Sequence, residues 1–127
     1  MQSCIFCKIV AGEDPCYKIY EDKEFLAFLD IYPRIKGHVL LIPKKHYRWI
    51  YDVPNFGKYW EAALKITKAL QKALNPEFVN YVTYGMDVPH AHIHILPRTF
   101  GKAFVPDIQQ IPKHEMEEVA EKIRRQI

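Results

Sequence analysis

Three histidines alternate with small or aliphatic residues in one short stretch, His90-Ala91-His92-Ile93-His94-Ile95. Side chains on a β-strand point to opposite faces in turn, so the imidazoles would line one face and the apolar side chains the other. The apolar face can pack into a core. The histidine face needs a chemical explanation, because each ring buried there must find a hydrogen-bond partner.

Three interpretations of this histidine row compete. The rings are structural groups on a hydrated sheet face, or they hold a metal, or one is a nucleophile while its neighbours bind an anionic substrate. Same-face positions on a strand are about 6.6 Å apart, so His90 and His94 start about 13 Å apart, too far for all three rings to share one ion. Two rings could still share a metal, and metal-dependent hydrolysis stays open as a hypothesis. A neutral imidazole attacks phosphorus well when its second nitrogen is held, which favours the nucleophile.

Cys4 and Cys7 have the Cys-x-x-Cys spacing, which occurs in buried pairs, redox dithiols and zinc sites. A redox dithiol would stand at the start of a helix, but the segment from Cys4 to Val10 predicts little regular structure. Zinc needs two further ligands, and His46 and His90, each next to an end of an expected strand, are the best placed. The sequence therefore predicts a zinc site formed by Cys4, Cys7, His46 and His90.

The composition is that of one soluble globular domain. The 127 residues are 49% hydrophobic and 26% charged, enough to bury a core without disulfides. No apolar run is long enough to span a membrane, and the first residues lack the basic start and apolar core of a signal peptide. The three cysteines suit a reducing compartment, so we expect a cytoplasmic protein. A net charge of +3 suits a small anionic ligand and is too small to predict nucleic-acid binding.

Hydrophobic periodicity predicts the elements that position these residues. Strands are expected at 18–22, 25–31, 38–42, 78–84 and 91–97. The first two would form a hairpin, and the last two an antiparallel pair joined by a short turn at 85–89. Amphipathic helices are expected over 55–74 and, shorter, from Lys113 to Ile127. Residues 1–98 would form the domain, and 99–127 a C-terminal extension docked on the core or on a partner.

Taken together, these segments resemble the histidine-triad (HIT) family of nucleotide-binding hydrolases and transferases. The family's defining motif, His-x-His-x-His followed by two apolar residues, matches residues 90–96. Segments 4–10 (CIFCKIV), 25–31 (FLAFLDI) and 40–46 (LLIPKKH) match the family's other motifs in the same order. The resemblance covers residues 4–98 and is far more specific than the triad alone.

The resemblance implies an α+β fold with about five antiparallel strands and one main helix, usually assembled as a homodimer. His92 would be the nucleophile, with His94 and His38 at the phosphate. In the zinc-bearing prokaryotic members, two cysteines and two histidines hold a structural zinc. These positions correspond to Cys4, Cys7, His46 and His90.

The resemblance also implies how a purine nucleotide would be bound. Asp30 would hold the ribose hydroxyls, and apolar side chains would surround the base. These apolar residues are Phe6, Ile9, Phe28 and Ile31. An ordinary place in the hydrophobic core is an equal alternative for the four.

The implied reaction is attack by His92 on the α-phosphorus of a nucleotide conjugate, either a phosphoramidate or a dinucleoside polyphosphate. Water would then hydrolyse the nucleotidyl-histidine, so that one difficult displacement is divided into two. His94, His38 and backbone N–H groups would stabilise the charge on the phosphoryl oxygens. The alternative is a non-catalytic nucleotide-binding or regulatory module.

The sequence departs from the family just before the triad. Many members have Gly-Gln-Ser/Thr-Val where this chain has Gly85-Met86-Asp87-Val88, and the preceding connection is shorter. An ionised Asp87 in the substrate site would repel a phosphate unless it is protonated, points at a histidine or serves as the acid for the leaving group. The leaving group is therefore the part of the substrate that the resemblance does not fix.

Overall fold

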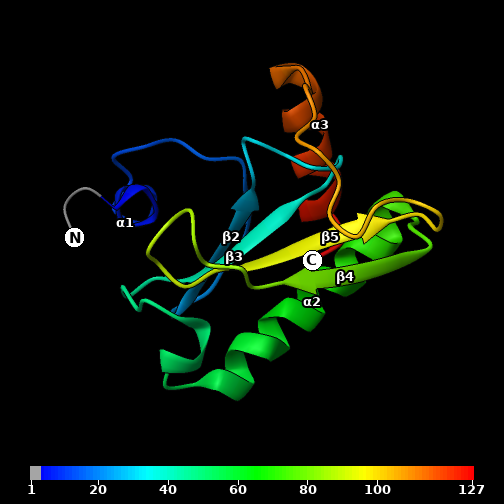
Figure 1. Cartoon of the computed structure of the whole chain (residues 1–127). Coiled ribbons are helices and arrows are strands. Elements are labelled where there is room, and N and C mark those ends of the chain that lie inside the picture. The colour runs from blue at the N-terminus through cyan, green and yellow to red at the C-terminus, as the bar shows by residue number, and fades with distance from the viewer. Residues whose placement is uncertain (1–3) are drawn as a thin grey trace.

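The computed structural model describes residues 4–127 of the chain (Figure 1). Its elements, in chain order, are α1 (Ile5–Val10), β1 (Lys18–Glu21), β2 (Phe25–Leu29), β3 (Val39–Pro43), the 3-10 turn η1 (Ile50–Asp52), α2 (Phe56–Leu74), β4 (Phe78–Val82), β5 (Ile93–Arg98) and α3 (Lys113–Arg124). Within the described range, none of the helices has both the length and the apolar character needed to cross a membrane.

The five strands form one antiparallel sheet in the order β1-β2-β3-β5-β4. β1 and β2 form the predicted hairpin, and Asp22 closes its turn by accepting hydrogen bonds from the backbone N–H groups of Glu24 and Phe25. β5 lies between β3 and β4, so the end of the histidine row is in the sheet interior while β4 forms an edge. The predicted α+β fold with a five-stranded antiparallel sheet is confirmed.

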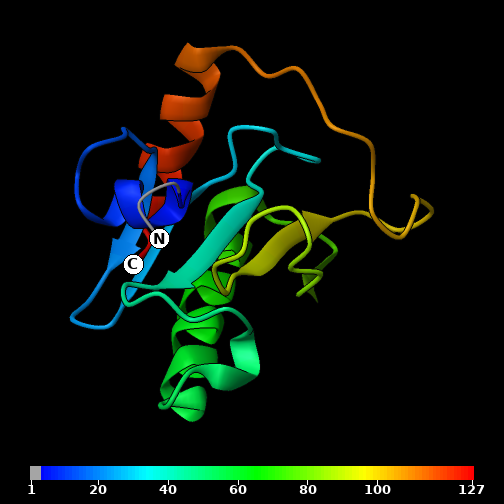
Figure 2. The same cartoon turned by 60° about the vertical axis from the view of Figure 1, so that its left-hand side comes forward.

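The two long helices pack on the same side of the sheet (Figures 1 and 2). α2 is the predicted amphipathic helix, and its buried face carries Tyr59, whose hydroxyl donates to the carbonyl oxygen of Leu41 in β3 at 2.8 Å. The helix ends at Asn75, which has a left-handed φ of 51° and precedes Pro76. The alternate apolar residues of β5, Ile93 and Ile95, are fully buried under these helices.

α3 docks on the core of its own chain, one of the two arrangements expected for the extension. It packs against α2 and against β1 and β2. Its four buried residues, which belong to the main core, are Met116, Val119, Ala120 and Ile123. Figure 2 shows residues 99–112 running along the outside of the molecule from the end of β5 to α3. The Arg98 guanidinium holds the start of this segment by donating to the carbonyl oxygens of Ala103 and Phe104.

The opposite side of the sheet is covered in part by α1, which the sequence did not predict. The expectation of little regular structure from Cys4 to Val10 was wrong, because Cys4 takes the N-cap position and its Sγ accepts a hydrogen bond from the Cys7 N–H. Phe6 of α1 is buried against Phe28 of β2, with ring centroids 5.6 Å apart. The Cys-x-x-Cys motif therefore stands at the start of a helix, with Cys4 as N-cap and Cys7 inside α1. The sheet is antiparallel throughout, whereas a thioredoxin-like unit contains parallel strands.

Three predicted strands are two residues shorter than expected at one end. β4 ends at Val82 rather than residue 84. In the other two strands, polar groups redirect the chain. β2 ends at Leu29 rather than residue 31, since Asp30 accepts a hydrogen bond from the N–H of Tyr32 and turns the backbone. β5 begins at Ile93 rather than residue 91, since the N–H of Ala91 donates to the carbonyl oxygen of Tyr47 instead of joining the sheet. Residues 83–92 therefore form a longer connection than the short turn predicted at 85–89.

Candidate functional site

His92 is fixed in a single orientation beside β5. Its Nδ1 lies 2.6 Å from the carbonyl oxygen of His90, which can only accept a hydrogen bond, so Nδ1 carries the proton and Nε2 has the free lone pair. The ring is 4% exposed and packs edge-on against Phe6 with centroids 5.2 Å apart. Burial lowers the pKa of His92, which keeps the ring neutral near pH 7. A neutral imidazole with Nε2 unprotonated is the nucleophilic form.

His38 and His94 form a second hydrogen-bonded unit next to it. The backbone N–H of Arg34 donates to Nδ1 of His38 at 3.1 Å, so His38 carries its proton on Nε2. That Nε2 lies 2.9 Å from Nδ1 of His94 and donates to it, which leaves the N–H of His94 on its Nε2. The Arg34 backbone thus sets the tautomer of both rings and gives His94 one outward donor.

Burial keeps this pair of rings neutral as well. Burial, together with the neighbouring histidines and Arg34, lowers the pKa of His38 to about 3 and that of His94 to about 4. Asp30 lies beside the pair, with Oδ2 3.6 Å from Nε2 of His38. Its carboxyl is mostly buried, and this burial raises the pKa of Asp30. The pair therefore presents N–H dipoles rather than positive charges to a ligand.

Cys4, Cys7, His46 and His90 form one compact group on the other side of His92. Their ligand atoms all lie within 4.8 Å of one another. Nδ1 of His90 is 3.4 Å from Sγ of Cys4 and 3.5 Å from Sγ of Cys7, and Nδ1 of His46 is 3.3 Å from Sγ of Cys7. A tetrahedral zinc ion with Zn–S of about 2.3 Å and Zn–N of about 2.0 Å would hold sulfur and nitrogen about 3.5 Å apart. The spacing of this group fits such an ion.

The protonation of the group also suits a metal better than a redox pair. Nε2 of His90 lies 2.8 Å from the carbonyl oxygen of Pro43 and donates to it, so Nδ1 keeps a lone pair toward the sulfurs. Burial and the neighbouring Cys4 raise the pKa of the Cys7 thiol to about 11. A redox thiol needs a lowered pKa, whereas a bound cation can displace the proton.

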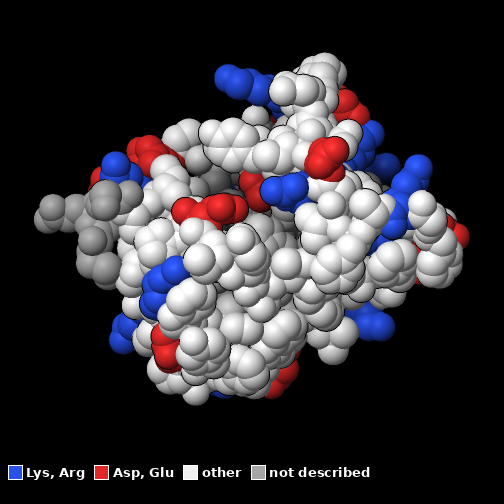
Figure 3. Space-filling view, viewed as in Figure 1, with Lys and Arg blue, Asp and Glu red and all other residues white. Residues whose placement is uncertain are grey.

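A cavity of about 860 Å³ opens beside the histidines, between α1, β2 and the N-terminal part of α3. In the space-filling view the molecule is hollowed between α1 and α3, with acidic and basic side chains at the rim (Figure 3). The apolar lining includes Phe6, Ile9, Phe28, Ile31, Leu40 and Val88. Its charged lining is Asp14, Asp30, Arg34, Asp87, Lys113 and Glu117. Leu40 pairs with His94 across β3 and β5, so the cavity floor meets the histidine row.

Comparison with known proteins matches residues 11–101 of this chain to the model of the HIT domain. The chain belongs to the HIT family. An uncharacterized HIT-like protein of Methanocaldococcus jannaschii is 39% identical over an alignment 127 residues long, which covers 95% of this chain and 98% of that protein. An adenosine 5′-monophosphoramidase of Saccharomyces cerevisiae is 38% identical over 80% of this chain and 66% of its own length.

Solved HIT structures resemble the whole chain, α3 included. A HIT-like protein of Bartonella henselae has a TM-score of 0.88 and 33% identity, covering 100% of this chain and 98% of its own. A zinc-bound histidine-triad protein of Mycobacterium smegmatis has a TM-score of 0.80 and 33% identity, covering 98% of this chain and 93% of its own.

The HIT fold brings the residues singled out in the sequence into three adjoining groups. The four expected metal ligands form the Cys/His group, and Asp30, His38 and His94 form another. The six residues expected to contact the nucleotide line one cavity; they are Phe6, Ile9, Phe28, Asp30, Ile31 and Asp87. Phe6 and Phe28 are buried, whereas the Ile31 side chain is 61% exposed and is not part of the core.

Several residues near the HIT-domain site escaped sequence reasoning. Arg34 lines the cavity, and Arg48 lies close enough to lower the pKa of His92. Lys113 and Glu117 of α3 line the cavity although they belong to the extension 99–127, in which no site residue was predicted. Both arginines lie in polar connections next to predicted strands. A single positive charge in such a connection is only weak evidence for a binding site. For the α3 residues the sequence carries no signal, because their place depends on how α3 docks.

Proposed function

We propose that this HIT protein is a nucleotide hydrolase or nucleotidyltransferase that cleaves at the α-phosphorus of a nucleotide conjugate through a nucleotidyl-His92 intermediate. The observation that carries the proposal is the fixed tautomer of His92, which leaves Nε2 unprotonated on a ring that packs against Phe6 of the cavity lining. Relatives support the class of reaction. The yeast relative is named an adenosine 5′-monophosphoramidase, and a 38% identical relative from Arabidopsis thaliana, of which this chain covers 52%, an adenylylsulfatase.

In the proposed first step, Nε2 of His92 forms a bond to phosphorus while the bond between phosphorus and the leaving group breaks. An amine leaving group takes up a proton from solvent. In the second step water attacks phosphorus, its oxygen stays on the nucleotide, one proton returns to solvent, and His92 is released. The N–H on Nε2 of His94, oriented by His38, would donate to a phosphoryl oxygen whose charge grows in both transition states.

The cavity suits a purine nucleoside in the same proposal. Asp30 stands between the apolar part of the cavity and the His38–His94 pair, where its carboxylate would accept hydrogen bonds from ribose hydroxyls. Flat apolar walls for the base would come from Phe6, Ile9, Phe28 and Ile31. Ile31 is exposed and lines the cavity, so its side chain is accessible to a ligand.

We further propose that the Cys/His group holds a structural zinc. Cys4, Cys7, His46 and His90 would supply the four ligands, which leaves no open coordination position for catalysis. Bound zinc would contribute stability, by tying α1 to the segment that carries His92. Three free thiols suit a reducing compartment, which we propose is the cytoplasm.

A homodimer is part of the proposal as well. β4 is an edge strand of the sheet, and its outer backbone groups could pair with the same strand of a second copy. Sedimentation equilibrium would show a mass of twice 15.0 kDa if this assignment is right. A monomer at micromolar concentration would contradict it.

Acid quenching during turnover of adenosine 5′-phosphoramidate tests the catalytic assignment. Mass spectrometry should find adenylate attached to the peptide that contains His92, and His92→Ala should lose both the adduct and the activity. Calorimetry with AMP checks that this variant still binds nucleotide. Turnover by His92→Ala at the wild-type rate would overturn the mechanism, and nucleotide binding without turnover by the wild type would instead favour a regulatory module.

A further inference from the structure

The charged lining of the cavity is unusual for a site that would receive a nucleotide. It contains four carboxylates, from Asp14, Asp30, Asp87 and Glu117, and two cationic groups, from Arg34 and Lys113. The balance is negative, and the buried neutral histidines do not change it. A ligand that carries several phosphates would add further negative charge, which is unfavourable at short range. The cavity therefore suits a conjugate with little net negative charge.

Asp87 is the carboxylate placed to act on the leaving group. It lines the cavity, together with its neighbour Val88, in the connection that leads into the histidine row. The same cavity is lined by Phe6, whose ring packs edge-on against His92, and by Leu40, which pairs with His94 across β3 and β5. Asp87 therefore faces the space that adjoins the histidine row.

Asp30 and Asp87 both line the cavity, but they differ in the hydrogen bonds and ion pairs that their carboxylates already form. Asp30 accepts a hydrogen bond from the N–H of Tyr32 and lies beside His38. Asp87 has no ion-pair partner within the part of the chain that the structure describes. An exposed carboxylate without a partner can pair with a charge on the ligand.

The nearby arginines are engaged elsewhere. Nη1 of Arg48 donates to the carbonyl oxygen of Gly85 at 2.9 Å, and its guanidinium lies 3.7 Å from the centre of the Trp49 ring. Nη1 of Arg34 donates to the carbonyl oxygen of Pro106 at 3.0 Å. Among residues 4–127, neither guanidinium forms an ion pair with Asp87, so neither neutralises the charge of that carboxylate directly.

We propose that Asp87 selects conjugates whose leaving group is an amine that bears a second, positively charged nitrogen. This inference rests on the proposed function and names its substrate class, a nucleoside monophosphate joined through a P–N bond to a cationic amine. The ammonium of such an amine would pair with the Asp87 carboxylate, whereas a leaving phosphate, sulfate or carboxylate would be repelled by it.

Three AMP conjugates of matched length test the selection. They carry butane-1,4-diamine, butylamine or 4-aminobutanoate, so the far end of the leaving group is cationic, neutral or anionic while the P–N bond is the same. For the wild type we expect kcat/KM to fall from the cationic to the neutral to the anionic conjugate. Each step should be about tenfold, because the first loses one attraction to Asp87 and the second adds one repulsion. The differences should shrink with added salt, because Asp87 is exposed and screening reaches about 10 Å at 0.1 M.

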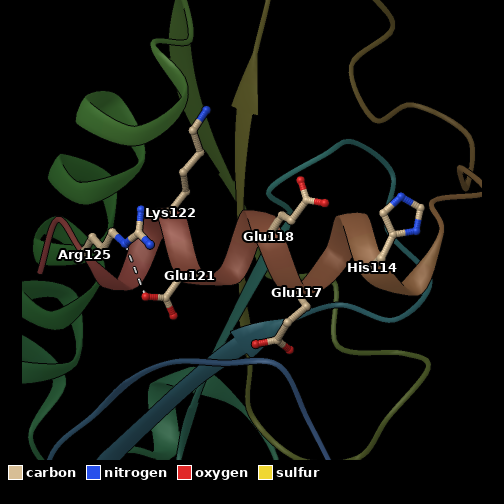
Figure 4. A pocket seen from close by; sticks show the side chains of 6 residues that line it. All are labelled: His114, Glu117, Glu118, Glu121, Lys122 and Arg125. Atoms are coloured by element: carbon tan, nitrogen blue, oxygen red, sulfur yellow. Dashed lines mark ion pairs between the residues drawn. The ribbon is translucent and has the colours of Figure 1, made fainter.

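Asp87→Asn removes the charge and keeps the shape of the side chain, so it should bring the three kcat/KM values together. Glu118→Gln is the matched control, because it removes one negative charge at an exposed position of α3. Figure 4 shows Glu118 with His114, Glu117, Glu121, Lys122 and Arg125 along a shallow groove on the outer side of α3. Glu118 does not line the cavity, so the Glu118→Gln variant should keep the wild-type order.

The possible results distinguish a failure of the Asp87 proposal from a failure of the proposed function on which it rests. If the wild type cleaves none of the three conjugates and forms no adduct on His92, the proposed function fails. If it cleaves all three without an order by charge, or if Asp87→Asn keeps the wild-type order, only the role of Asp87 is overturned. Diadenosine tetraphosphate or adenylylsulfate cleaved faster than the diamine conjugate would also overturn it.

Discussion

The carbonyl oxygen of His90 accepts a hydrogen bond from the Nδ1–H of His92 at 2.6 Å, while Nδ1 of the same His90 lies 3.4 Å from Sγ of Cys4. One residue therefore belongs to the proposed metal site through its ring and to the nucleophile through its backbone. Its backbone N–H is also held, by the carbonyl oxygen of Val88 at 2.9 Å. A displacement of the His90 ring would move the group that sets the tautomer of His92.

Loss of the metal should make the orientation and tautomer of the His92 ring less uniform, although the side chain itself is unchanged. Cys7→Ser deletes one of the two sulfurs that face Nδ1 of His90, so zinc content should fall. We expect kcat to fall by about tenfold, as for other groups that orient an active residue indirectly. ¹⁵N chemical shifts of the His92 ring should change from a single tautomer to a mixture.

Cys16→Ser provides the control for metal binding, since Cys16 is a free thiol outside the Cys/His group. This variant should keep one zinc per chain by elemental analysis. A Cys7→Ser variant without metal whose His92 ring shifts match the wild type would show that the two sites are independent.

The His38–His94 pair should matter to catalysis through the direction of one N–H. His38→Gln cannot hold Nδ1 of His94 in the same way, so the donor that faces the phosphoryl oxygen would lose its orientation. We expect kcat to fall by about a hundredfold, the effect of losing one preorganised donor, with a smaller change in KM. His114→Gln, at an exposed position on α3, should leave both constants unchanged. Equal activities of the two variants would exclude a role for the pair.

The sequence predicted the positions of the five strands and the chemical groups of the site because both depend on short-range patterns. Alternation placed His92 and His94 opposite Ile93 and Ile95, and helical spacing located α2 almost to the residue. The metal ligands could be grouped because few residue types bind zinc, so the choice of partners for Cys4 and Cys7 was narrow.

What the sequence could not predict depends on contacts between distant segments. α1 is stabilised by capping from the Cys4 sulfur and by packing of Phe6 on β2. Neither contribution is included in the helix propensities of the residues. The late start of β5 follows from a hydrogen bond between Ala91 and Tyr47. The tautomers of His38 and His94 depend on a backbone N–H in the loop before His38, which no residue type reveals.

Acid should destabilise the protein through His38 before it protonates most carboxylates. The folded pKa is about 3, well below the ordinary value of 6.5, so the unfolded chain binds a proton that the folded chain excludes. Stability is therefore complete above about pH 6.5 and is lost as the pH falls toward 3, by up to about 1.4 kcal/mol per pH unit for this one ring. Urea unfolding at several pH values measures the slope.

His38→Gln should reduce the dependence of the unfolding free energy on pH, because glutamine binds no proton in the unfolded chain. This holds even if the variant is less stable at pH 7. The other buried rings, which include His94, contribute in the same direction and would still be present. A variant slope equal to that of the wild type would mean that His38 is protonated in the folded protein.

α3 should unfold together with the sheet rather than as a separate extension. Ile123 is fully buried in the main core, and Ile123→Ala would leave a cavity that costs about 2–5 kcal/mol of unfolding free energy. Lys122→Ala, at the adjacent exposed position, should change it by less than about 0.5 kcal/mol. Urea denaturation followed by tryptophan fluorescence reports on Trp60 of α2 and on Trp49 before η1, and far-UV circular dichroism reports on all helices. Because α3 contacts α2, β1 and β2, we expect Ile123→Ala to shift the fluorescence and the circular dichroism transitions by the same amount. A shift of the circular dichroism transition alone would mean that residues 99–127 unfold separately from the sheet.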